Sequence, residues 1–114
     1  MNPTTHTHTH KRGDTFFMLL QLPARFPDGL FADWAVTSQL RTVRGQLIDN
    51  ITAAWADPVP GTARVISLRC NDTREWPVGQ AEFDVQLTGP DGFVVSTRTV
   101  TVYITRDATR HAYP

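Results

Sequence analysis

The stretch of residues 81–87 alternates strictly between apolar and polar side chains, and this pattern constrains the fold more than any other part of the chain. A period of two predicts a half-buried β-strand. The turn sequence Gly-Pro-Asp-Gly follows at residues 89–92, and residues 93–105 are rich in Val, Thr, Phe and Tyr, so the region predicts a β-hairpin. The apolar face changes register near residues 97–99. This change predicts a bulge there and makes the second limb a candidate to cross between two sheets.

Further strands are predicted along the rest of the chain. Residues 34–41 and 65–70 repeat the alternation of apolar and polar side chains. Residues 15–22 are predicted to be a strand with apolar side chains at alternate positions on one face and with Phe17 and Leu19 partly covered on the other. Residues 45–56 fit either a helical face or an extended segment, and their Ile and Thr content favours a strand.

Helix signals are short by comparison. Asp72 stands three residues before Glu75, and this capping box predicts a single helical turn over residues 71–76. Six or seven short strands with turn signals between them predict an all-β fold, a single antiparallel immunoglobulin-like β-sandwich. A small barrel is the alternative.

Length and composition fit one domain with a polar extension at each end. The chain has 114 residues, of which 40% are hydrophobic, enough for a single core. Residues 1–12 are expected to form a flexible arm that can be removed without unfolding the domain, residues 13–109 the sandwich, and residues 110–114 a tail. Cys70 is the only cysteine, so no intrachain disulfide can form, and a reducing cytoplasm fits folding best.

The net charge of the chain is zero, so it does not attract a polyanion. The 11 basic and 11 acidic side chains cancel, so neither nucleic acid nor a membrane is expected as a partner.

One histidine run could hold a metal. His6, His8 and His10 alternate with threonines, which would place three imidazoles on one side of an extended segment that could chelate zinc or nickel. No Cys, Asp or Glu accompanies the run, so a polar tail without metal is favoured, and no cofactor is predicted.

No catalytic residues are predicted. The serines lie outside any Gly-x-Ser-x-Gly sequence, the only glutamates are Glu75 and Glu82, and most aspartates stand in turns. The protein is therefore expected not to be an enzyme. Of the three tryptophans, Trp34 is predicted to be core, whereas Trp55 and Trp76 could be either core or interface.

The order of several short motifs resembles a known family. These motifs are Arg12-Gly13-Asp14-Thr15, a Trp34 strand ending in Gln39-Leu40-Arg41, Asp72-Thr73 before Trp76-Pro77-Val78-Gly79, Phe83-Asp84-Val85, Asp91-Gly92, and Thr105-Arg106-Asp107-Ala108-Thr109. In this order the chain resembles the small immunoglobulin-like β-sandwich proteins of tailed phages and prophages, and is similar to the N-terminal domain of phage baseplate upper proteins.

The resemblance implies a structural or assembly protein of a phage tail or baseplate. Its partners would be other virion proteins or further copies of itself, and its location the bacterial cytoplasm during assembly and then the virion. The expected contact elements are the arm and the tail from residue 106, and the candidate interface residues are Trp55, Trp76, Arg106 and Tyr113. The alternative is a carbohydrate- or host-surface-binding module that uses Trp55, Trp76 and loop aspartates.

Overall fold

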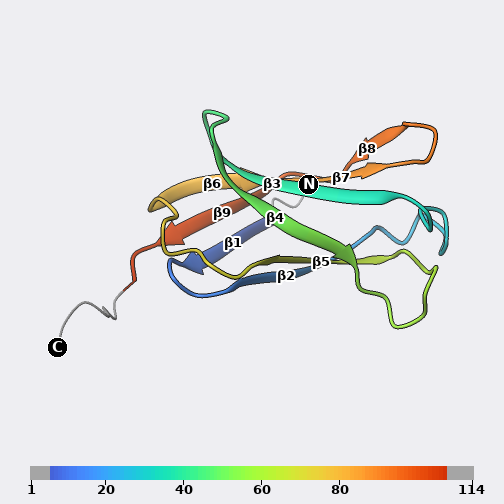
Figure 1. Cartoon of the computed structure of the whole chain (residues 1–114), viewed down its shortest axis with the longest axis horizontal. Helices are drawn as coiled ribbons and strands as arrows, with labels where there is room; N and C mark the ends of the chain where they lie inside the picture. Colours follow the sequence, from blue (N-terminus) through green and yellow to red (C-terminus); the bar gives the residue numbers. More distant parts are fainter. Residues whose placement is uncertain (1–5, 108–114) are drawn as a thin grey trace, which may run out of the picture.

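The computed structural model describes residues 6–107 and shows an all-β protein with nine strands (Figure 1). No helix able to span a membrane is present among these residues. The strands are β1 (His6–Lys11), β2 (Phe16–Gln21), β3 (Ala35–Thr42), β4 (Leu47–Trp55), β5 (Val65–Cys70), β6 (Gly79–Phe83), β7 (Val85–Thr88), β8 (Val94–Ser96) and β9 (Val100–Thr105).

The strands pair in the order β1-β9-β6-β3-β4-β5-β2, and β7 pairs with both β3 and β8. Every pair is antiparallel except β1 with β9, which is parallel. Strand β4 pairs with β3 through residues 47–51 and with β5 through residues 52–55, so it carries the sheet around a corner. The sheet thereby curves into a nearly closed, barrel-like arrangement. The predicted all-β, largely antiparallel fold is confirmed, but the predicted number of six to seven strands is wrong.

One additional strand comes from the segment predicted to be a flexible arm. Residues 6–11 form β1, which pairs with β9 from His6 opposite Val100 to Lys11 opposite Thr105. The rings of His8 and His10 each lie 5.5 Å from the ring of Phe16, so imidazoles cover the core where the sequence offers no apolar face. The prediction of an arm is therefore wrong for residues 6–11, and residues 1–5 lie outside the described part of the chain.

The remaining extra strands arise because both limbs of the predicted hairpin are broken. The first limb divides at Asp84, whose carbonyl oxygen accepts a hydrogen bond of 2.6 Å from the Ser38 hydroxyl. The second limb divides at residues 97–99, where the Thr97 N–H donates to the Val85 carbonyl oxygen over 2.9 Å. A break at the predicted bulge is thus present. However, β8 and β9 belong to the same sheet, so the predicted crossing between sheets by this limb is wrong.

Two local predictions have opposite outcomes. The ambiguous residues 45–56 contain strand β4, as favoured. The predicted helical turn over residues 71–76 is absent, because the Asp72 carboxylate accepts from the Arg74 N–H as in an Asx-turn, which competes with a helix. The Trp76 N–H then closes the turn on the Thr73 carbonyl oxygen.

The core lies between the curved sheet's inner faces. Its most deeply buried apolar side chains are Phe16, Leu40, Ile66, Leu68, Val85, Leu87 and Val102. Phe16 contacts both Trp76 and Phe83 through ring pairs at 5.5 and 6.0 Å. These contacts join β2 to the opposite side of the barrel, where no backbone ladder connects β2 to β1 among the described residues.

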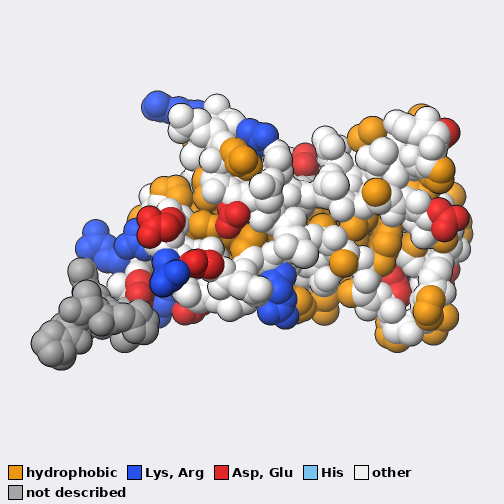
Figure 2. Space-filling view, viewed as in Figure 1, with side chains coloured by type: hydrophobic (Ala, Val, Ile, Leu, Met, Phe, Trp, Pro, Cys, Tyr) orange, Lys and Arg blue, Asp and Glu red, His pale blue; other side chains and the backbone are white. Residues whose placement is uncertain are grey.

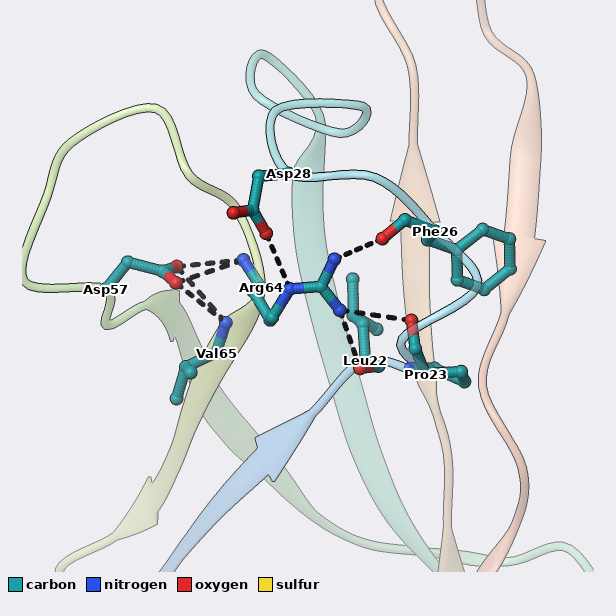
Figure 3. A network of polar contacts seen from close by, with 7 residues as sticks. All are labelled: Leu22, Pro23, Phe26, Asp28, Asp57, Arg64 and Val65. Atoms are coloured by element: carbon teal, nitrogen blue, oxygen red, sulfur yellow. Dashed lines mark hydrogen bonds and ion pairs between the residues drawn. The ribbon is translucent and has the colours of Figure 1, made fainter.

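Hydrogen bonds from Arg64 connect the long loop after β2 to the start of β5 (Figure 3). Its guanidinium donates to the carbonyl oxygens of Leu22, Pro23 and Phe26. It also forms an ion pair of 2.7 Å with Asp28. From the other side, the Asp57 carboxylate accepts the backbone N–H groups of Arg64 and Val65 at 3.0 to 3.2 Å. Because these groups satisfy one another, we assign this network a structural role.

Candidate functional site

A polar hollow of about 720 Å³ lies on the outer face of the sheet, against β3, β6 and β7. We call it the polar hollow. Its polar lining consists of Thr37, Ser38, Gln39 and Arg41 from β3, Asn50 from β4, and Glu82, Asp84, Gln86 and Thr99. Gly45 of the β3–β4 hairpin forms one wall. Figure 2 shows that the outline of the molecule is indented between this hairpin and the β7–β8 hairpin.

Alternation along the chain explains which side chains reach the hollow. Ala81, Phe83, Val85 and Leu87 are all buried in the core. The intervening residues Glu82, Asp84 and Gln86 therefore point to the opposite face, as expected for extended backbone. The polar face of the predicted half-buried strand over residues 81–87 thus borders a concave surface.

The hollow has one wall that is internally bonded. The Arg41 guanidinium donates to the Gly45 carbonyl oxygen at 2.8 Å and to the Gln39 side-chain oxygen at 2.6 Å. The Gln39 amide in turn donates to the Asn50 side-chain oxygen at 3.1 Å. This chain of hydrogen bonds orders the β3–β4 wall and directs two donors of Arg41 to neutral acceptors, so its positive charge remains at the hollow.

The opposite wall is free to bind. Within residues 6–107, the side chains of Glu82, Asp84 and Gln86 form no hydrogen bond or ion pair. Carboxylates accept hydrogen bonds and amides both donate and accept, so this row can bind a ligand that carries hydroxyl groups. Sequence reasoning did not assign Gln39, Asn50 and Gln86 to a site, although the alternation over residues 34–41 already placed polar side chains on one face.

The predicted interface tryptophans do not contribute an exposed platform. Trp76 is only 3% exposed, its ring lies 5.0 Å from that of His10, and its indole N–H donates to the Asp49 carboxylate at 3.0 Å. Its assignment to an interface is therefore wrong, because the Pro-containing turn folds it into the core. Trp55 is half-buried, packs against the core and donates its indole N–H to the Trp34 carbonyl oxygen at 2.9 Å.

The other interface candidates lie near the C-terminus. Arg106 is exposed, and Tyr113 lies outside the described residues. Trp34, predicted to be core, is half-buried and packs against Phe31 and Phe93 at 4.9 and 6.2 Å between ring centroids.

Within the histidine run, His8 and His10 pack against other side chains. His10 is 5% exposed, and its Nε2 lies 3.1 Å from the Thr73 hydroxyl oxygen. That hydroxyl donates its proton to the Asp14 carbonyl oxygen and also accepts the Gly13 N–H, so the His10 Nε2 must be the donor. Burial lowers the pKa of both His8 and His10 and favours their neutral forms. Among the described residues, no group of three His, Cys, Asp or Glu could hold a metal.

Cys70 packs as a buried residue. Its burial raises the thiol pKa to about 11, so the nucleophilic thiolate is scarce at neutral pH.

Comparison with known proteins identifies a shared fold. No protein-family model and no curated protein matches the sequence. A solved structure of a mutant SrpA adhesin from Streptococcus sanguinis is similar, with a TM-score of 0.55 and 13% sequence identity. The match covers 90% of this chain and 56% of that chain, so this chain spans little more than half of the adhesin structure. At this identity the likeness concerns the fold alone.

Proposed function

We propose that this protein is a non-enzymatic binding module that recognises a carbohydrate on a surface through the polar hollow. The observation that carries the proposal is the row of Glu82, Asp84 and Gln86, whose side chains line a concave surface and bond to no other side chain or backbone group among residues 6–107. Sugar hydroxyls both donate and accept hydrogen bonds, so they match a row of carboxylates and amides. The similarity of the fold to that of an adhesin supports the same class of function.

We further propose that the architecture is an immunoglobulin-like sandwich. The order β9-β6-β3 corresponds to strands G, F and C of that fold, and the order β2-β5-β4 to strands B, E and D. In this assignment β4 supplies the strand after C and then strand D, and β1 adds to the free side of strand G. The polar hollow would then lie on the G-F-C face, away from the other sheet.

Binding to an array of immobilised glycans tests the function. We expect Asp84→Asn and Gln86→Ala to abolish binding of any glycan that the unaltered protein retains, while the thermal unfolding midpoint stays the same. Gln21→Ala is the matched control, since Gln21 is also an exposed strand glutamine but lies on β2. Retention of a glycan by both hollow variants, or retention of none by the unaltered protein, would contradict the proposal.

A second candidate function is assembly into a phage tail or baseplate. The order of motifs from Arg12 to Thr109 supports it. So do the edges of β1 and β2 that have no partner strand within residues 6–107, because an unpaired edge can bind a strand of a neighbouring subunit. In this proposal the protein is made in the bacterial cytoplasm and then enters the virion. Mass spectrometry of purified particles from a strain that expresses the protein would detect it there, and its absence from particles would exclude this role.

A further inference from the structure

In the described part of the chain, strand β2 has an unusually apolar edge without a partner strand. Its sequence Phe-Phe-Met-Leu-Leu-Gln contains no charged residue, and among residues 6–107 it pairs with β5 alone. Phe17 and Leu19 on its outer face are 45% and 59% exposed. Natural proteins usually protect an edge strand with a charge, a proline or a bulge, because an unprotected edge pairs with other chains. Within β2 none of these features is present.

A groove of about 600 Å³ runs along this edge. We call it the apolar groove. Met18, Leu20 and Leu22 line it on the β2 side, Leu87, Val95 and Val100 line the opposite side, and Phe26 and Phe31 from the loop after β2 complete the lining. Two apolar walls on either side of a free edge would bind the alternate side chains of an added strand.

The groove extends the space between β9 and β2 that β1 fills. Strand β1 lies between β9 and β2, where His8 and His10 contact Phe16, and it pairs with β9 up to His6 opposite Val100 (Figure 1). Thr7 of β1 and Val100 of β9 both line the groove, so the groove begins where the described part of β1 begins. At that point β9 and β2 are separated by one strand, β1, so the groove starts with the width of a single strand.

Charge indicates the kind of strand that fits. The lining contains Arg25 and Arg98 and no acidic side chain. The Arg25 guanidinium stacks over the Phe26 ring at 4.7 Å, which holds its charge beside the groove. An acidic residue at the end of a bound strand would meet the Arg25 guanidinium.

We propose that the apolar groove accepts an extended segment of another protein, with apolar side chains at alternate positions and an acidic residue at the end beside Arg25. The segment adds to the free edge of β2 through backbone hydrogen bonds, and its apolar side chains fill the space between β2 and β8. This interaction surface is separate from the polar hollow and does not depend on the function proposed for it.

A synthetic peptide tests the proposal. The probe is a capped seven-residue peptide of glutamate, valine, threonine, valine, threonine, valine and glutamate, titrated into the full chain by NMR. We expect shifts at the amides of residues 18–22 and 95–98, and slower amide exchange on β2. Arg25→Glu should weaken binding about fivefold, the effect of one charge pair, and a peptide with lysine ends should recover affinity for this variant. Arg44→Glu, on the distant β3–β4 hairpin, is the matched control and should bind normally.

Three results would overturn the proposal. The first is no binding of the acidic peptide at millimolar concentration. The second is protection of β2 that depends on protein concentration without peptide, which would identify a second copy of the chain as the occupant. The third is binding only after residues 1–5 are removed, which would identify the chain's own N-terminus as the occupant.

Discussion

The polar hollow and the apolar groove differ in how the fold produces them. The hollow lies over β3, β6 and β7, which pair with neighbours, so its character comes from side chains that alternation directs outward. The groove lies where pairing stops, between the free edge of β2 and the short β8, so its character comes from backbone and from core side chains left partly uncovered. Substitutions at the hollow should therefore affect binding alone, whereas changes around the groove should also affect stability.

The largest effect is expected from removing residues 1–12. This deletion removes β1, exposes Phe16 and Trp76, and leaves β9 paired on one side only, with β6. Uncovering two large core aromatics costs about 3–5 kcal/mol, a large share of the stability of a small domain. We expect circular dichroism to show an unfolded protein, or size-exclusion chromatography to show an aggregated one.

Removing only residues 1–5 is the control for that deletion, since it keeps all of β1. An unchanged unfolding midpoint after removal of residues 1–12 would show that β1 contributes little, and would restore the prediction of a dispensable arm.

A smaller loss of stability is expected for Arg64→Met. The Arg64 side chain is only 17% exposed, and its loss leaves the carbonyl oxygens of Leu22 and Phe26 without their donor, whereas that of Pro23 still accepts the Phe26 N–H. We expect a loss of about 2–3 kcal/mol, measured by urea denaturation, because carbonyl groups left unsatisfied in a partly buried setting are costly. Since this loop carries Phe26, peptide binding in the groove should weaken too.

Arg69→Met provides the comparison for Arg64→Met. The Arg69 guanidinium lies over the exposed ring of Phe17, and the substitution should change stability by less than about 0.5 kcal/mol. Equal losses for both variants would show that the carbonyl contacts of Arg64 contribute nothing specific.

Acid should weaken the closure of the barrel at β1. Burial lowers the pKa of His8 and His10 below 6.5, and the mutual repulsion of the two rings lowers that of His10 further, whereas Asp14 opposes this shift. The unfolded chain therefore binds protons more readily than the folded one, and stability is complete above pH 6.5 and falls as the pH is lowered through the two folded-state pKa values. We expect the thermal midpoint to decrease between pH 7.5 and pH 5.

His10→Gln separates this effect from the titration of other groups, because an amide N–H can still donate to Thr73. The variant should lose part of the pH dependence in this range. Asp72, whose pKa is held at about 2 by Arg74, titrates at lower pH and does not contribute there. A midpoint that falls equally in both proteins would show that His10 is not responsible.

Sequence patterns predicted the parts of the molecule that depend on alternation. The strands from residues 34–41 and 65–70, the outward direction of Glu82 and Asp84, and the break near residues 97–99 all follow from local periodicity. The role of β1 could not be predicted, because His8 and His10 become core residues only when Phe16 and Thr73 meet them from distant positions. Whether Trp76 belongs to the core or to an interface could not be predicted for the same reason, because its indole N–H donates to Asp49, which lies 27 residues away in the sequence.

The smallest effect on stability is expected in the polar hollow, and one matched pair of substitutions makes the contrast measurable. Asp84→Asn removes a charge that bonds to nothing among residues 6–107, so the free energy of unfolding should change by less than about 0.5 kcal/mol. Asp57→Asn is the same chemical change in a carboxylate that accepts two backbone N–H groups, and it should cost about 1–2 kcal/mol. Urea denaturation of both variants measures the difference. If Asp84→Asn is as destabilising as Asp57→Asn, the Asp84 carboxylate supports the fold, and its availability to a ligand no longer follows.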